Sequence, residues 1–104
     1  MVQIKITDTA KKNTAFIYKF IKRESIQNAI MVSESIIKKI DSLYNKPDIG
    51  KIVKEFNNEK IREIKLFKFR IIYLLNSPTL VEIITIHHSS RLLENNPHLK
   101  NLFG

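Results

Sequence analysis

The stretch "FKFRIIYLLNSPTLVEIITIHHSSRLL", from Phe67 to Leu93, decides the fold, because two apolar, β-branched runs surround a short Asn-Ser-Pro turn. Runs of this composition on either side of a turn predict a β-hairpin. The first run, Lys68–Leu75, has apolar side chains at both alternating sets of positions, and such a strand belongs in the middle of a sheet. The second run, Leu80–His87, is its expected partner.

Two further strands are predicted outside this hairpin. Val2–Thr7 alternates apolar and polar residues, which is the pattern of a half-buried strand. Lys60–Leu66 follows the turn "NKPDIG" and is rich in β-branched residues. The sheet is therefore expected to occupy about residues 60–88, with a short C-terminal segment at 89–104.

Two amphipathic helices are predicted between the first strand and the sheet. Helical spacing begins near Asp8, which is a candidate cap, and Ser25 can cap a second helix that continues to Tyr44. Because the connection is very short, the two helices must pack as an antiparallel hairpin over about residues 8–44. The first apolar stripe comprises Ala10, Thr14, Ile17 and Ile21, widened by Phe16 and Phe20, and the second comprises Ile26, Ala29, Ile30, Ser33, Ile36, Ile37, Ile40, Leu43 and Tyr44.

These elements predict a single α+β domain over residues 1–104. The N-terminal strand and the helical hairpin would pack on one face of an antiparallel sheet. The opposite face would then expose apolar side chains of the central strand, which indicates a partner site. Alternatively, the segment Leu92–Phe103 folds back over this face, and the sequence alone leaves both arrangements open.

Composition narrows the functional class. The chain has 18 Lys and Arg against 10 Asp and Glu, a net charge of +8, which attracts nucleic acid, a ribosome surface or an acidic protein unless it only solvates the surface. The absence of cysteine excludes disulfides and thiolate chemistry and fits a reducing cytoplasm. No stretch approaches the roughly 20 apolar residues of a membrane span, and no signal peptide is evident. We therefore expect a cytoplasmic protein without membrane contact.

Four motifs in a fixed order carry a family resemblance. They are "KPDIGKIVKEF" (residues 46–56), "IREI" (61–64), "FRIIY" (69–73) and "IHHSSRLL" (86–93). With these motifs the chain, from Ile4 to about Leu93, resembles the RelE/ParE toxins of bacterial type II toxin–antitoxin systems. The resemblance implies the compact α+β toxin fold. It also implies a hetero-oligomer with a cognate antitoxin whose C-terminal segment, often acidic, wraps the toxin.

The resembled family divides into two mechanisms. RelE-like members cut mRNA on the ribosome, which requires cations around the reacting phosphate and a general acid and base. ParE-like members lack that set and poison DNA gyrase. By resemblance, Arg70 matches the arginine that contacts the phosphate in RelE-like toxins, although many ParE-like sequences carry it too. Its alternative role is an ion pair with Glu63 or Glu82 on a neighbouring strand.

His87 and His88 are adjacent in a predicted strand and therefore point to opposite faces. Only one of them can enter a site on the open face, where a histidine could serve as a general acid. We favour the alternative that they belong to the family's His-x-x-Arg strand ending, with the histidine bonding to backbone or a partner. As a metal pair they are unconvincing, and neither a metal nor a cofactor is expected.

The C-terminal sequence departs from RelE-like enzymes, because it has Arg91 and Lys100 but no tyrosine. We therefore favour a non-enzymatic, ParE-like toxin that inhibits DNA gyrase. The alternatives are a ribosome-dependent mRNA endonuclease with Arg70, His87 and His88 as catalytic residues, or a degenerate toxin that only binds its antitoxin. The residues expected to contact antitoxin or target are Arg62, Arg70, Tyr73, His88 and Arg91.

Overall fold

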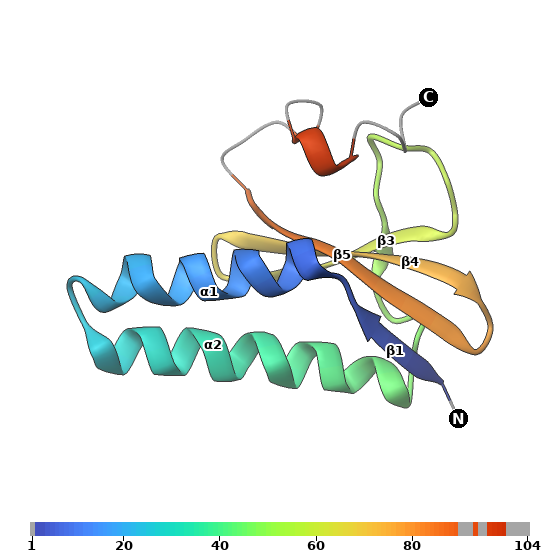
Figure 1. The fold of residues 1–104 in the computed structure, drawn as a ribbon. Coiled ribbons are helices and arrows are strands. Elements are labelled where there is room, and N and C mark those ends of the chain that lie inside the picture. Colours follow the sequence, from blue (N-terminus) through green and yellow to red (C-terminus); the bar gives the residue numbers. More distant parts are fainter. Residues whose placement is uncertain (1, 90–92, 94–95, 100–104) are drawn as a thin grey trace.

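The computed structural model describes residues 2–89, 93 and 96–99, and it confirms the α+β class. Two helices form an antiparallel hairpin that packs on one face of a five-stranded sheet (Figure 1). The elements, in chain order, are β1 (Gln3–Ile6), α1 (Asp8–Lys22), α2 (Ile26–Asp41), the 3-10 helix η1 (Ser42–Tyr44), β2 (Lys51–Ile52), β3 (Ile61–Leu66), β4 (Phe69–Ser77), β5 (Leu80–His88) and the 3-10 helix η3 (Pro97–Leu99).

The sheet has the order β1-β5-β4-β3-β2, so β4 lies at its centre as predicted. β2, β3, β4 and β5 pair antiparallel, whereas β1 pairs parallel to β5 at the edge. The sheet is therefore mixed, and the N-terminal strand is part of it.

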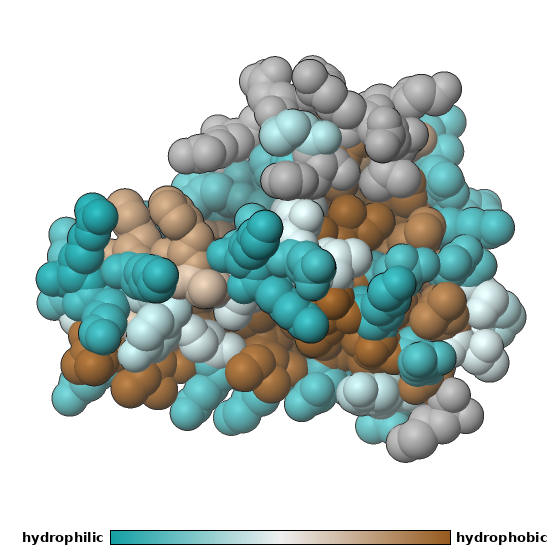
Figure 2. All heavy atoms as spheres, in the orientation of Figure 1, coloured by the Kyte–Doolittle hydropathy of each residue, from teal (hydrophilic) through white to brown (hydrophobic). Residues whose placement is uncertain are grey.

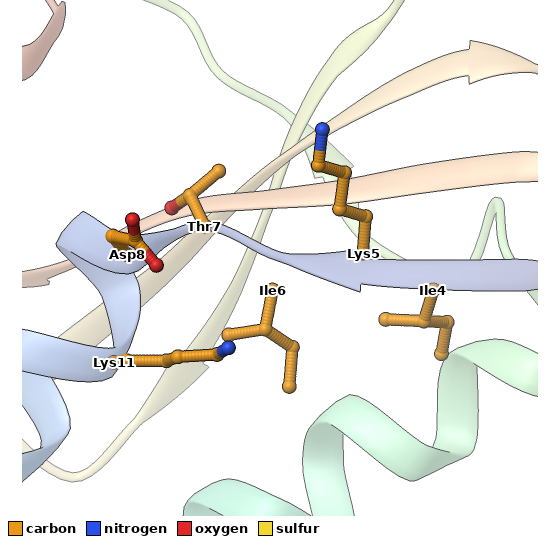
Figure 3. Close-up of a pocket in the computed structure, with 6 residues that line it drawn as sticks. All are labelled: Ile4, Lys5, Ile6, Thr7, Asp8 and Lys11. Carbon is orange, nitrogen blue, oxygen red and sulfur yellow. The ribbon is translucent and has the colours of Figure 1, made fainter.

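The junction between β1 and α1 is fixed by Thr7, which caps α1 in place of the predicted Asp8. The Thr7 hydroxyl accepts a hydrogen bond from the Ala10 amide at 3.2 Å and lies 2.7 Å from the Ile83 carbonyl, to which it donates. A pocket opens here along the free edge of β1 (Figure 3). In that view Ile4 and Ile6 point towards α2 and Lys5 points to the opposite side.

The helix-side core is narrower than the predicted stripes. Along α2 the buried positions are Ala29, Val32, Ile36 and Ile40, with Val32 absent from the prediction. The hairpin projects beyond the sheet in Figure 1, so side chains near its tip have no strand to pack against. The predicted stripe residues that prove exposed are Phe16, Phe20, Ile26, Ile30, Ile37 and Tyr44.

The sequence left two arrangements open for the opposite sheet face, and the structure shows that residues near the C-terminus cover part of it. Leu93 and Leu99 from the C-terminal segment are fully buried against Val53, Ile61 and Ile72, which form a second core. For these two leucines, the arrangement in which the C-terminal segment folds back over the sheet is the one observed. A central strand that is apolar on both faces needs cover on both, and Leu93 and Leu99 supply part of it on the second face.

Candidate functional site

Arg70 is the centre of an ion-pair cluster on the sheet face opposite the helices. It lies two residues before Ile72 of the second core, so both side chains leave β4 on the same side. Its guanidinium donates to both oxygens of Glu55, at 2.9 and 3.1 Å, and its Nε donates to Glu63 at 3.0 Å. A further close contact joins Nη2 to Glu63. Arg70 is thus held between two carboxylates.

The cluster draws its members from separate elements. Glu63 comes from β3, and Glu55 comes from the loop that follows β2. The hydrogen bond from Arg70 lowers the pKa of Glu55, and the two carboxylates raise the pKa of Arg70, chiefly through the bond to Glu55. Both effects favour the charged forms. The Arg70 charge is therefore already compensated within the protein.

The two histidines have different surroundings, as predicted, because neighbouring residues of a strand point to opposite faces of the sheet. His87 is the cross-strand partner of Arg70 and is buried, with its Nδ1 2.9 Å from the side-chain nitrogen of Asn96. His88 lies on the helix-side face and packs edge-on against Phe69, with ring centroids 5.6 Å apart. The structure brings Arg70 and His87 to one face and leaves His88 on the other.

Tyr73 is a core residue, which contradicts its expected contact with a partner. It is fully buried, and burial raises the pKa of its phenol. Its hydroxyl donates to the Pro47 carbonyl at 2.8 Å and accepts from the Gly50 amide at 2.9 Å. A Cβ on Gly50 would come within 2.5 Å of that hydroxyl, so only glycine lets the backbone approach so closely. Tyr73 therefore anchors the loop after η1.

Arg62, the cross-strand neighbour of Tyr73, also bonds to this loop and to the turn before β3. Its guanidinium donates to the carbonyls of Asp48, Gly50 and Glu59, each at 3.1 Å. The side chain stays partly exposed. Arg91, the last of the predicted contact residues, lies outside the described residues.

Three of the four motifs therefore meet in space, in two hydrogen-bonded groups on opposite faces of the sheet. "KPDIGKIVKEF" contributes Gly50 and Glu55, "IREI" contributes Glu63, and "FRIIY" contributes Arg70 and Tyr73. The Arg70–Glu63 pair was one of the predicted alternatives, whereas Glu82 bonds to Asn76 instead. Two residues of the site were not predicted from the sequence. Glu55 had only its place in the first motif as a signal, and Asn96 had no signal in the sequence.

Within the part of the chain that the structure describes, Arg70 carries no uncompensated charge and no three metal-ligating side chains come together. None of the helices described here is long and apolar enough to cross a membrane. The chain is a small, basic α+β protein.

Comparison with known proteins identifies the family. A family model described as the ParE toxin of the type II toxin–antitoxin system, parDE, matches residues 4–93. A solved structure described as the chromosomal ParDE TA system from P. aeruginosa is similar with a TM-score of 0.68 and 16% identity. The match covers 85% of this chain and 96% of that chain, and at this identity it supports the fold alone. No curated protein matches.

Because the family model covers most of its length, the chain belongs to the ParE toxin family of type II toxin–antitoxin systems. The predicted family, its ParE-like branch and the role as the toxin component are confirmed. A toxin of this class has an antitoxin as its partner.

Proposed function

We propose that this toxin acts by binding and inhibiting DNA gyrase, without cutting RNA, and that an acidic antitoxin segment holds it inactive in the cytoplasm. The observation that carries the proposal is the double pairing of Arg70 with Glu55 and Glu63. An RNA-cleaving site needs that cation for the reacting phosphate. Here two carboxylates already occupy it.

The pairing disfavours the ribonuclease on energetic grounds. Charge-assisted hydrogen bonds contribute about 1.5–3 kcal/mol each, and a phosphate would have to displace several of them from Arg70. The two carboxylates would also repel the phosphate. A donor that must first be released cannot serve as the preorganised electrostatic stabilisation on which such catalysis depends.

The histidines add to the same argument. His87 is only 5% exposed and its Nδ1 bonds to Asn96, so RNA has little access to it in this conformation. His88 leaves β5 on the other face of the sheet, away from Arg70. The histidine that shares a face with Arg70 is buried, and the partly exposed His88 lies on the other face, which supports a toxin that acts by binding.

The proposed antitoxin site is a groove between α1 and α2. Apolar residues of both helices line it, and Lys11, Lys19 and Lys22 lie at its rim. An acidic segment with apolar anchors complements this arrangement in shape and charge. The contact with Arg70 that the sequence suggested would need Glu55 or Glu63 to move, so we place the antitoxin on the helices.

Induced expression in bacteria tests the target. The proposal expects an SOS response and filamentation, because inhibited gyrase damages DNA, and it expects protein synthesis to continue in the first minutes. Co-expression of the neighbouring antitoxin gene should suppress both effects. Rapid loss of translation without SOS induction would favour mRNA cleavage. Normal growth with a stable antitoxin complex would identify a degenerate toxin.

A further inference from the structure

Two aromatic rings on the exposed side of α1 have no role in the core or in the cluster around Arg70. Phe16 is 69% exposed and Phe20 60% exposed. The rings stack one helical turn apart, with centroids separated by 6.3 Å and planes 18° from parallel. Figure 2 shows apolar side chains over the half of α1 that lies away from β1, bordered by hydrophilic ones. Exposed rings of this size are a typical feature of binding surfaces.

Cations border the ring pair along the same helix. Lys12 precedes Phe16 by four residues and Arg23 follows Phe20 by three, so these side chains share one face. All four are exposed. We name Lys12, Phe16, Phe20 and Arg23 the aromatic ridge. Its partner should be anionic and should present flat apolar surfaces.

The ridge is distinct from the groove between α1 and α2, because neither phenylalanine lines that groove. A groove takes inserted side chains, whereas protruding rings offer faces for stacking. Planar bases linked by phosphates combine the required flat surfaces with negative charge, and proteins bind single strands by this combination of stacking and cations. We infer that the aromatic ridge binds single-stranded DNA, with bases on Phe16 and Phe20 and phosphates at Lys12 and Arg23.

A single strand fits better than a duplex, because paired bases are stacked on one another and leave no face for the rings. The choice of DNA over RNA rests on the proposed function, since gyrase acts on DNA and the ridge carries no acceptor for a 2′-hydroxyl proton. The two proposals can fail separately. A ridge variant that loses DNA binding but still inhibits gyrase would show that gyrase inhibition does not require the ridge. Both proposals would then still stand.

The first test is fluorescence anisotropy with the full chain and a labelled oligothymidine of about 15 nucleotides. Phe16→Leu/Phe20→Leu keeps apolar surface but removes the rings, and we expect at least a roughly tenfold weaker Kd. Phe16→Tyr/Phe20→Tyr keeps the rings and should bind like wild type. Met31→Ala, an exposed apolar control on α2 outside the groove, should also bind like wild type.

The second test is the salt dependence of the same binding. Each phosphate contact adds about −0.7 to the slope of log K against log salt for a single strand, so Lys12→Ala/Arg23→Ala should reduce the slope by roughly 1.4. Lys38→Ala/Lys39→Ala removes the same charge from α2 and should leave the slope unchanged. Circular dichroism checks that every variant remains folded.

Several results would overturn the inference. Wild-type binding by the double leucine variant would mean that the rings do not stack on bases. Failure to saturate below about 100 µM oligonucleotide at low salt would exclude useful affinity. If the ridge bound oligouridine ten times more tightly than oligothymidine, its ligand would be RNA and not DNA. Ring-dependent binding to phosphatidylglycerol vesicles, without ring-dependent oligonucleotide binding, would assign the ridge to a lipid surface.

Discussion

Replacing Arg70 by methionine should strongly destabilise the fold, because it leaves the buried carboxylate of Glu63 without its cationic partner. Glu63 is 6% exposed in its side chain and has Arg70 as its cationic partner, whereas Glu55 is 32% exposed and can be rehydrated. Removing one partner of a buried ion pair costs about 3–5 kcal/mol. The loss of the half-exposed Glu55 pair adds at most about 1 kcal/mol.

The free energy of unfolding is measured by urea denaturation at pH 7, with circular dichroism as the signal. A loss of 3–5 kcal/mol would lower the Tm of a chain of this size by roughly 15–30 °C. Arg70→Met/Glu63→Leu removes both buried charges and should recover at least half of the loss. This double variant is the matched control, because it separates the stranded charge from the lost packing.

Two results would refute this reasoning. If Arg70→Met lowered the free energy of unfolding by less than about 1 kcal/mol, the cluster would behave as a surface ion pair. If the double variant were as unstable as the single one, packing of the arginine stem would dominate, and the electrostatic account of the site would be wrong.

Other predictions concern the loop, the pH dependence and the groove. Gly50→Ala forces a Cβ against Tyr73 and should cost about 1–3 kcal/mol by urea denaturation, whereas Lys51→Ala next to it should be nearly neutral. Because Arg70 lowers the pKa of Glu55, the stability from this pair is present above the ordinary glutamate pKa of about 4.3 and is lost as the pH falls below it. In Arg70→Met this acid-induced loss should shrink, which pH-dependent Tm measurements detect. Ile37→Glu places a charge at an exposed position in the basic-rimmed groove, so antitoxin binding by titration calorimetry should weaken at least tenfold with an unchanged Tm. An unaltered affinity would mean that the antitoxin binds at a different surface of the toxin.

The secondary structure could be predicted because its signals are local. Alternation identified β1, apolar β-branched runs beside turns identified β3, β4 and β5, helical spacing identified α1 and α2, and the Ser25 cap was recovered. A strand apolar on both faces correctly indicated the centre of the sheet. The parallel pairing of β1 with β5 was not predicted, because alternation reports which face is buried and not which neighbour a strand has.

Contacts between distant parts of the chain account for most of the errors. The sequence marks Phe16, Phe20 and Ile37 as helix-stripe residues, but whether they are covered depends on how far the sheet extends beneath the helices. Glu55 and Arg70 are fifteen residues apart with a strand between them, so no periodicity links them. Tyr73 was expected to contact a partner, and it lies in "FRIIY", one of the motifs that carry the family resemblance. Its burial depends on the loop at Gly50.

The most direct test of the central claim uses purified toxin, freed of antitoxin, in two assays side by side. One measures supercoiling of relaxed plasmid by DNA gyrase, and the other measures cleavage of mRNA on programmed ribosomes. The account predicts that supercoiling is inhibited and that mRNA stays intact. Codon-positioned cuts that disappear in Arg70→Ala, together with unaffected gyrase, would contradict it.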